Sequence, residues 1–282
     1  MIPTFTILIA TYNAATLLPR TLDSLAAQSC RDFNVIIQDG ASSDDTVAVA
    51  QSYADKVPAL LLDSVKDRGI YDAWNKALDR WQGDLGEWVL FLGAGDELVS
   101  KTTLLHLKML LQEAPSEILF AGGTVVKDST SGIETLSYAY KPDLFDKHRL
   151  MLPHSAMFHR KQLFFRATFD TRFKILGDRA FLCKHWNMNN GNFIIPFAVT
   201  KMQRGGISDN PRIIGHLRYE AFIIKQLYET MSIKETISGS IGVLKGYIIA
   251  LFYIIFRKNA PDILNFIQRI RGKEPRWKYD EL

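Results

Sequence analysis

A short apolar run that stops at glycine and aspartate limits the fold of this chain more than any other feature. Residues 88–92 are all apolar, and Gly93, Ala94, Gly95 and Asp96 follow directly. An apolar run of this length, bounded by glycine, is typical of a strand buried on both faces of a parallel sheet. Open α/β sheets bind ligands beyond the carboxyl ends of such strands. We therefore predict that Asp96 lies at a ligand-binding edge, where a carboxylate recruits a cation or a sugar hydroxyl.

The rest of the first 117 residues alternates between strand and helix patterns. Further strands are predicted at residues 5–10, 35–38 and 60–63. Helical spacing relates three sets of apolar residues: Leu18, Leu22 and Leu25; Ile70, Trp74, Ala77, Leu78 and Trp81; and Leu104, Leu107 and Leu111. Ser43 is expected to cap another helix, with Asp44 and Asp45 in its first turn. Such repeats join parallel strands by right-handed crossovers, so we expect an α/β fold with a mostly parallel central sheet flanked by helices.

Beyond residue 117 the pattern changes. Short β segments precede a mixed stretch at residues 152–208, which is expected to hold one β segment and two short helices, and a helix follows at 211–230. The last segment differs again, because its apolar residues are accompanied by basic ones and no acidic residue ends a strand. We therefore divide the chain into three parts: residues 1–117 and 118–230, as two halves of one domain, and a C-terminal helical extension at 231–282.

The bulk composition excludes several functional classes. The formal net charge of +4 is too small and too scattered to indicate nucleic-acid binding. The two cysteines, Cys30 and Cys183, show no metal-ligand spacing and favour a reducing, cytoplasmic compartment. No basic stretch precedes the apolar residues 7–10, so this segment is predicted to be the first strand rather than a signal peptide.

Polar side chains follow the other predicted strands as well. Thr11, Tyr12 and Asn13 come directly after the first strand, Asp39 after the second, and Asp67 a few residues after the third. Aspartate and asparagine commonly begin turns and cap helices, and for Asp67 alone a cap is the more frequent role. Polar groups at four strand ends along one sheet edge are instead typical of a ligand site.

Residues 4–100 resemble the donor-binding half of the family 2 inverting glycosyltransferases, which adopt the nucleotide-diphospho-sugar transferase fold called GT-A. The matching motifs lie, in the family's order and spacing, at residues 9–13, 37–44, 67–77 and 91–96. A thinner match continues at residues 153–155, 177–178 and 205–208. Within the family, the chain is most similar to enzymes that build bacterial exopolysaccharide or O-antigen repeat units, of the colanic-acid type.

The resemblance implies a donor-binding half at residues 1–117 and an acceptor and catalytic half at 118–230. The residues that would bind the donor nucleotide are Thr11, Tyr12, Asn13, Asp39, Asp67 and Gly69. Asp39 would accept a hydrogen bond from the base. A carboxylate suits the imide N–H of uracil, because a charged acceptor strengthens the bond, so a UDP-sugar is the expected donor.

The resemblance also implies that Asp96 binds a divalent cation, Mg or Mn, bridging the two phosphates of the donor. The metal neutralises the charge that grows on the leaving diphosphate. The family usually presents two acids in an Asp-x-Asp arrangement, whereas here Gly93, Ala94 and Gly95 precede the single Asp96. Magnesium often takes only one or two carboxylates, so we expect weak metal binding until the donor is present. Glu97 is the nearest second acid, although its position favours the start of the next turn.

Asp178 matches the position of the family's catalytic base. In an inverting displacement this carboxylate takes the proton of the acceptor hydroxyl as the new bond forms. The family often has a second acid beside it, but here the neighbours are Gly177 and Arg179. The arginine is expected to keep Asp178 ionised. On spacing alone Asp178 fits equally well as the N-cap of a helix at residues 180–187, and the resemblance favours catalysis.

Two further candidates rest on weaker signals. His154 fits a contact with the acceptor or a phosphate, although a lone histidine is more often a polar residue packed in the interior. Gly205, Gly206 and Ser208, with Arg204 beside them, offer backbone N–H groups and positive charge to a diphosphate. A plain surface turn explains the same four residues equally well.

Residues 241–256 are strongly apolar and interrupted by Lys245, which leaves about eleven uninterrupted residues. That run falls short of the roughly twenty that span a bilayer. Basic residues follow, beginning with Arg257 and Lys258. An apolar segment with basic flanks can lie in an anionic membrane interface. A helix docked on the catalytic domain or on another subunit is the alternative.

We therefore expect an inverting glycosyltransferase that moves a sugar from a nucleotide-diphospho-sugar to a saccharide acceptor. The acceptor is expected to be lipid-linked, and the enzyme to be peripheral on the inner face of a bacterial membrane, in surface polysaccharide biosynthesis. A homo-oligomer is compatible with the sequence. The alternative is a non-catalytic nucleotide-sugar-binding protein of the same fold, with a degraded metal site.

Overall fold

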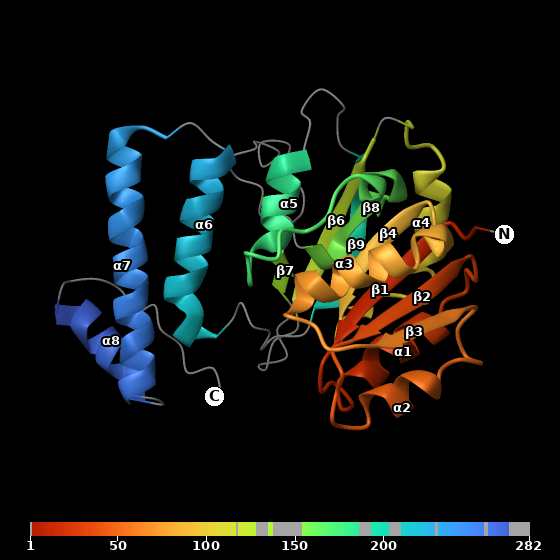
Figure 1. Cartoon of the computed structure of the whole chain (residues 1–282), viewed down its shortest axis with the longest axis horizontal. Coiled ribbons are helices and arrows are strands. Elements are labelled where there is room, and N and C mark those ends of the chain that lie inside the picture. The colour runs from red at the N-terminus through yellow and green to blue at the C-terminus, as the bar shows by residue number, and fades with distance from the viewer. Residues whose placement is uncertain are drawn as a thin grey trace. The chain divides into compact units, whose positions relative to one another are not determined.

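The computed structural model describes residues 2–116, 118–127, 135–137, 154–185, 193–202, 210–228, 231–256 and 259–270. The chain divides into two compact units, residues 1–204 and residues 205–282. The first unit contains every predicted strand, and the second consists of helices (Figure 1).

A nine-stranded sheet forms the centre of the first unit. Four neighbouring strands run parallel to one another: β1 (Phe5–Thr11), β2 (Phe33–Asp39), β3 (Leu60–Ser64) and β4 (Trp88–Gly93). All four predicted strands are confirmed, and each extends one residue beyond its expected end. This extra residue brings Thr11, Asp39 and Ser64 into the sheet itself, at its carboxyl edge.

The remaining strands lie on the far side of β4. The order across the whole sheet is β3-β2-β1-β4-β8-β6-β9-β5, with β7 paired to β6. Their bounds are β5 (Glu97–Leu98), β6 (Phe120–Lys127), β7 (Thr135–Ser137), β8 (Met157–Arg160) and β9 (Phe193–Met202). Strand β8 is antiparallel to β4 and β6, while β9 runs parallel to β6. The sheet is therefore parallel from β3 to β4 and mixed beyond β4.

Strand β9 was not expected, because only one β segment was predicted between residues 152 and 208. Its sequence contains Pro196, and a proline normally argues against a strand. The structure accommodates Pro196, which is exposed, where pairing with β6 jumps from Ile194 to Ala198. The proline therefore falls in an irregular part of the register, where no ladder hydrogen bond is needed.

Helices cover both faces of the sheet. Helices α1 (Leu18–Ala26), α2 (Thr46–Gln51) and α4 (Thr103–Leu111) share one buried cluster with alternate strand residues such as Ile7 and Ile9. Helices α3 (Ile70–Arg80) and α5 (Gly177–His185) flank a second cluster, which takes the intervening residues such as Leu8 and Phe91. Because successive strand side chains point to opposite faces, continuous apolar strands supply both clusters.

Two helix starts differ from expectation. Helix α2 begins at Thr46 rather than after Ser43, because the backbone N–H of Ser43 donates to Asn13 Oδ1 and ties that residue to the loop after β1. In α3 the expected apolar stripe began at Ile70, but Ile70 is 37% exposed and Tyr71 is 5% exposed. Trp74, Ala77 and Leu78 are buried as expected, and Tyr71 is buried in place of Ile70, which puts the Tyr71 hydroxyl inside the unit.

The second unit consists of α6 (Ile214–Tyr228), α7 (Ile233–Phe256) and α8 (Ala260–Ile270). Helices α6 and α7 approach closely at two glycines: a Cβ on Gly215 would lie 2.5 Å from the Tyr247 ring, and one on Gly246 would lie 3.0 Å from Gly215 Cα. This packing explains why α6 belongs with the extension at 205–282. The sequence division had placed α6 in the half at residues 118–230 instead.

Candidate active site at the carboxyl edge of the sheet

Three polar side chains stand side by side where β1, β2 and β3 end. In the parallel register Thr11 is the partner of Asp39, and Asp39 is the partner of Ser64. The Thr11 hydroxyl donates to Asp39 Oδ1 at 2.9 Å, and the Ser64 hydroxyl donates to Asp39 Oδ2 at 2.7 Å. Asp39 is thus held from both neighbouring strands.

The carboxylate of Asp39 accepts four hydrogen bonds from the protein. In addition to Thr11 and Ser64, the hydroxyl and the backbone N–H of Ser42 donate to it at 2.5 and 2.8 Å. Asp39 is fully buried, and burial opposes its ionisation. The hydrogen bonds from Ser42, Ser64 and Thr11 outweigh that effect and hold the pKa of Asp39 below its usual value. Any ligand that bonds to Asp39 must replace one of these donors.

The loops after β1 and β2 are cross-linked around Tyr12. The backbone N–H of Asn13 donates to Ser42 Oγ at 2.8 Å, and Asn13 Oδ1 accepts from the N–H of Ser43 at 2.9 Å. Asn13 adopts a positive φ of 47°, which asparagine tolerates better than most residues. This frame leaves Tyr12 67% exposed, so an aromatic ring is presented to solvent directly above the strand ends.

Asp67 lies against the same loops. Its Oδ1 accepts from the backbone N–H of Gly69 at 2.8 Å, so one carboxylate oxygen does serve the turn before α3. The other oxygen, Oδ2, sits 2.5 Å from where a Cβ of Gly40 would be, and the Tyr12 ring lies 3.3 Å from that point. Gly69 has a φ of +118°, which favours glycine. Asp67 and Tyr12 therefore both lie against Gly40, the residue that follows the buried Asp39.

Asp96 closes a turn at the end of β4. Its backbone N–H donates to the Gly93 carbonyl at 3.1 Å, and its Oδ2 lies 3.0 Å from where a Cβ of Gly93 would be. Gly95 takes a φ of +101°, and its N–H donates to the Thr21 hydroxyl at 2.8 Å. The space beside Gly93, which has no side chain, is taken by the carboxylate of Asp96 itself.

Glu97 is committed to a different partner. Its carboxylate forms an ion pair with Arg20 at 2.6 Å. Within the described ranges, no three His, Cys, Asp or Glu side chains gather as a potential metal site. The carboxylate of Asp96 is the kind of oxygen ligand that suits Mg²⁺ or Mn²⁺ when phosphate oxygens supply the other positions. The single-carboxylate arrangement fits a metal that arrives with the donor.

Asp178 lies in the first turn of α5 and contacts α3. Its Oδ1 is 3.2 Å from the Tyr71 hydroxyl, which is also 2.7 Å from the Ile175 carbonyl, and it accepts from the N–H of Arg179 at 2.8 Å. Burial raises the pKa of Asp178, and the bonds from Arg179 and Tyr71 offset only part of that effect. A carboxyl with a raised pKa is a stronger base once it has lost its proton.

The structure bears on two expectations about Asp178. Helix α5 begins at Gly177, so Asp178 is inside the helix and not the N-cap of a helix that starts at residue 180. Arg179 lowers the pKa of Asp178, as expected of a nearby positive charge, but desolvation is the larger effect and the pKa is raised on balance. The sequence shows which charges are close to Asp178, whereas the burial of Asp178 results from the packing of α5 against α3.

His154 is buried. Its ring stacks on Trp74 and Phe91, with centroids 4.9 and 5.0 Å apart, and neither ring nitrogen has a hydrogen-bond partner in the part of the chain that the structure describes. Burial lowers the pKa of His154 to about 3. This is the arrangement of the packed polar residue that the sequence left as the alternative. Arg204, Gly205, Gly206 and Ser208 lie outside the described residues.

Sequence reasoning missed four residues of this edge. Ser42, Ser64, Thr21 and Tyr71 each hold an aspartate or its turn, as described above. Ser42 and Tyr71 lie within recognisable motifs, and Ser64 directly follows a predicted strand. Ser64 could have been found by aligning the second and third predicted strands in parallel, because this register places Ser64 beside Asp39. Nothing in the local sequence indicates that Thr21 reaches Gly95.

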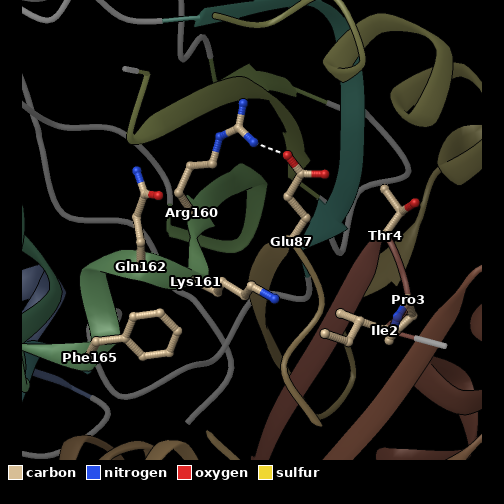
Figure 2. A pocket seen from close by; sticks show the side chains of 8 residues that line it. All are labelled: Ile2, Pro3, Thr4, Glu87, Arg160, Lys161, Gln162 and Phe165. Carbon is tan, nitrogen blue, oxygen red and sulfur yellow. Dashed lines mark hydrogen bonds and ion pairs between the residues drawn. The ribbon is translucent and has the colours of Figure 1, made fainter. Parts of the chain in front are cut away.

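A pocket of about 450 Å³ opens at the opposite edge of the sheet (Figure 2). It is lined by Ile2, Pro3, Thr4, Glu87, Arg160, Lys161, Gln162 and Phe165. These residues precede β1 and β4 or end and follow β8, so the pocket faces away from Asp39 and Asp96. Arg160 is paired with Glu87 and stacks over Trp88, so its charge is already used. The pocket is therefore separate from the candidate active site.

Comparison with known proteins shows the family of the chain. The family described as Glycosyl transferase family 2 matches residues 6–181. A PGL/p-HBAD biosynthesis glycosyltransferase of Mycobacterium bovis is 33% identical over 202 residues, which cover 71% of this chain and 73% of that protein.

Two solved structures share the fold. Staphylococcus aureus TarS 1-349 in complex with UDP-GlcNAc superposes with a TM-score of 0.61 at 19% identity, over 88% of this chain and 72% of that one. The mannosyltransferase PcManGT of Pyrobaculum calidifontis, in complex with GDP-Man and Mn²⁺, gives 0.62 at 20% identity, over 98% and 82%. The chain is therefore a glycosyltransferase that belongs to family 2 and has the GT-A fold.

Proposed function

We propose that the protein transfers a sugar from a UDP-sugar to a saccharide acceptor with inversion at the anomeric carbon. The observation that carries this proposal is the contact between Tyr71 and Asp178. It joins the segment after β3, which contains Asp67 and Gly69, to the position of the family's base. A donor bound at the strand ends and an acceptor activated by Asp178 would therefore share one site.

The donor nucleoside would bind where Tyr12 and Asp67 lie against Gly40, beside the buried Asp39. The exposed ring of Tyr12 offers a face on which a base can stack. Asp67 has an oxygen directed over Gly40, and Asp39 would accept the imide N–H of uracil once the Ser42 hydroxyl turns away. A structural relative bound to UDP-GlcNAc supports uridine, and one bound to GDP-Man shows that the fold also accepts guanosine.

Asp96 would hold the divalent cation that accompanies the donor. When bound, the cation neutralises the negative charge of the leaving nucleoside diphosphate. The chain contributes one carboxylate and a turn kept in shape by Thr21. A relative bound to GDP-Man and Mn²⁺ supports manganese. Because Glu97 is occupied by Arg20, we propose that the metal binds tightly only together with the donor phosphates.

Asp178 would act as the general base. It takes the proton from the acceptor hydroxyl while the acceptor oxygen bonds to the anomeric carbon and the diphosphate leaves from the opposite face. A single displacement of this kind inverts the configuration. The raised pKa of Asp178 favours proton transfer, because a stronger base is better matched to a weakly acidic alcohol.

The acceptor would be lipid-linked, and the second unit would hold the enzyme at an anionic bilayer. The run predicted to be too short for a membrane is part of α7, which has 24 residues and is long and apolar enough to cross one by length and composition. Along α7 an exposed apolar arc recurs every three or four residues: Ile237, Ile241, Leu244, Ile248, Leu251 and Ile255. The buried face at Gly246 packs on α6, so the arc lies on the other side of the helix.

Charge supports an anionic surface as the partner of this arc. After Glu235, α7 carries no acidic residue, and Arg257 and Lys258 follow it in the sequence. Basic residues beside an apolar surface favour anionic lipids, at about 1 kcal/mol for each residue near the surface. The relatives found include PGL/p-HBAD glycosyltransferases, so we propose a bacterial surface glycoconjugate in general as the product class, and the colanic-acid type is not singled out.

A thermal-shift panel tests the donor assignment. Purified protein is heated with UDP-glucose, UDP-galactose, UDP-GlcNAc and GDP-mannose, each with and without Mn²⁺. A bound donor stabilises the fold in proportion to its excess over the dissociation constant. We expect one UDP-sugar to raise Tm more in the presence of Mn²⁺, and Asp96→Asn to abolish that metal-dependent increment. Donor binding without any turnover would instead favour the non-catalytic binding protein.

Vesicle sedimentation tests the membrane assignment. The protein should sediment with vesicles that contain phosphatidylglycerol and much less with pure phosphatidylcholine. The double substitution Leu244→Gln/Leu251→Gln should weaken binding by about tenfold or more, because both side chains leave the lipid. Ser238→Gln, an exposed polar site on the same helix, is the matched control. A wild-type protein that stays in solution as a dimer, or as a monomer, would contradict the assignment.

A further inference from the structure

We propose that Tyr71 is a positioning residue for the base, which ties Asp178 to the helix that follows the donor-binding turn. This inference rests on the proposed role of Asp178. Tyr71 lies in the first turn of α3, two residues after Gly69, and its hydroxyl reaches α5 at Asp178 Oδ1, 3.2 Å away. Nothing in the sequence order brings these two helices together, since 107 residues separate the two side chains.

The packing around Tyr71 leaves its ring little freedom. The ring is buried, meets Trp74 edge-on at a centroid distance of 5.4 Å, and stacks on Phe169 at 5.9 Å. On the side of α5 it covers Gly177, where a Cβ would come within 2.7 Å of the ring carbons. A glycine directly before Asp178 therefore lets the tyrosine approach the backbone that carries the carboxyl. The packed ring fixes the position of the Tyr71 hydroxyl.

The Tyr71 hydroxyl has one proton and two acceptors. It lies 2.7 Å from the Ile175 carbonyl and 3.2 Å from Asp178 Oδ1. When Asp178 is ionised, donation to the carboxylate is the stronger bond because the acceptor is charged. When Asp178 is protonated, the hydroxyl can donate to Ile175 instead and accept from the carboxyl. Tyr71 therefore favours the ionised state, the form that can take a proton from the acceptor.

Burial raises the pKa of both side chains and so opposes ionisation of Asp178. Because the pKa of Tyr71 is raised, the tyrosine stays a neutral donor throughout the working range. The hydrogen bond from Tyr71 is thus one of the few contributions that oppose desolvation of the base. Without it, Asp178 would carry its proton to higher pH and would lose its fixed orientation.

The test compares Tyr71→Phe with wild type in nucleoside diphosphate release from the UDP-sugar that the panel selects, measured across pH. Loss of a charge-assisted hydrogen bond should move the acid limb of kcat/KM upward by about one pH unit. At pH values well above the acid limb, Tyr71→Phe should lower kcat less than it does at pH values below the limb. An acid limb that stays in place, or that moves to lower pH, would overturn the proposal.

The chain offers a matched control. Tyr53 donates to Asp23 Oδ1 at 2.7 Å, and it is also a buried tyrosine that bonds to an aspartate in the first unit. Tyr53→Phe removes a similar bond away from the site. It should lower Tm as much as Tyr71→Phe does, and it should leave the acid limb where wild type has it. An equal pH shift in both variants would also overturn the proposal.

A double-mutant cycle gives a readout that does not depend on turnover. The urea midpoints of wild type, Tyr71→Phe, Asp178→Asn and the double variant yield the coupling between the two side chains. This coupling should grow as pH rises through the ionisation of Asp178. A coupling independent of pH would contradict the proposal. If Asp178→Asn stays fully active, the proposed function fails, and the cycle still decides whether Tyr71 interacts with the ionised carboxyl.

Discussion

The hydroxyl of Thr21 accepts a hydrogen bond from the backbone N–H of Gly95 at 2.8 Å. It also lies 3.3 Å from the Gly93 carbonyl, so a side chain of α1 holds both glycines of the turn that carries Asp96. The only carboxylate proposed as a metal ligand therefore depends on a residue 75 positions earlier.

Thr21→Val should disturb this turn while keeping the shape of the side chain. The buried N–H of Gly95 would lose its acceptor, which costs about 1–3 kcal/mol. We expect a lower Tm and a smaller Mn²⁺-dependent stabilisation by the UDP-sugar. Thr16→Val, at an exposed position of the preceding loop, is the control. Unchanged metal-dependent stabilisation in Thr21→Val would show that the turn does not need this hydroxyl.

Asp39→Asn should destabilise the first unit. An amide presents one acceptor oxygen where the carboxylate takes hydrogen bonds on both, so two donors lose their partner and the fold loses about 2–4 kcal/mol. Because the pKa of Asp39 is lowered on folding, its ionised form stabilises the protein above the unfolded value of 3.8, and this stability is lost as pH falls through the folded pKa. Urea unfolding measures the loss, with the exposed Asp45→Asn as control. A midpoint equal to that control would refute the structural role.

The buried histidines should make the protein sensitive to acid. Folding lowers the pKa of His154 from 6.5 to about 3, and burial together with His154 lowers the pKa of His159 as well. The unfolded state therefore binds more protons below pH 6.5, so stability is complete above that pH and falls on acidification. The slope should reach about 1.4 kcal/mol per pH unit for each histidine.

His154→Phe should remove one part of this slope, since phenylalanine can stack on Trp74 and Phe91 without titrating. The free energy of unfolding, measured in urea over a pH series, reports the change. The exposed His106→Gln should leave the wild-type slope intact. A slope that is the same in all three proteins would mean that other groups cause the acid sensitivity.

Gly177→Ala should imitate the loss of the Tyr71 hydroxyl bond without touching the tyrosine. The added Cβ would come within 2.7 Å of the ring and push it away, which costs about 1–3 kcal/mol as overpacking. We expect lower stability and an upward shift of the acid limb of kcat/KM. Gly83→Ala adds the same group where no atom lies within 4 Å, and it should change neither. A Gly177→Ala enzyme with the wild-type pH profile would contradict the prediction.

The predictable part of the fold was the part with strong local periodicity. The strands that end near Thr11, Asp39 and Asp96 are continuous apolar runs stopped by polar residues, and their type and order follow from the sequence. The family motifs then located the carboxylates. Strand β9 was missed because Pro196 argues against a strand, and only the pairing with β6 shows that its register tolerates the proline.

The side chains that hold the carboxylates in place were harder to predict from the sequence. Ile70 looked like the buried residue of α3, but the helix turns Tyr71 inward because Gly177 and Phe169 leave room for its ring. Arg179 suggested an ionised Asp178, whereas burial decides the direction of its pKa. These features depend on residues about a hundred positions away, so no local pattern carries them.

Turnover by Asp178→Asn tests the central claim most directly. Donor affinity is measured by calorimetry with the selected UDP-sugar and Mn²⁺, and nucleoside diphosphate release is measured on the same samples. The account predicts unchanged donor binding with a rate lower by about 100-fold or more, because loss of a general base removes that much acceleration. A variant that binds the donor and turns over at the wild-type rate would contradict it.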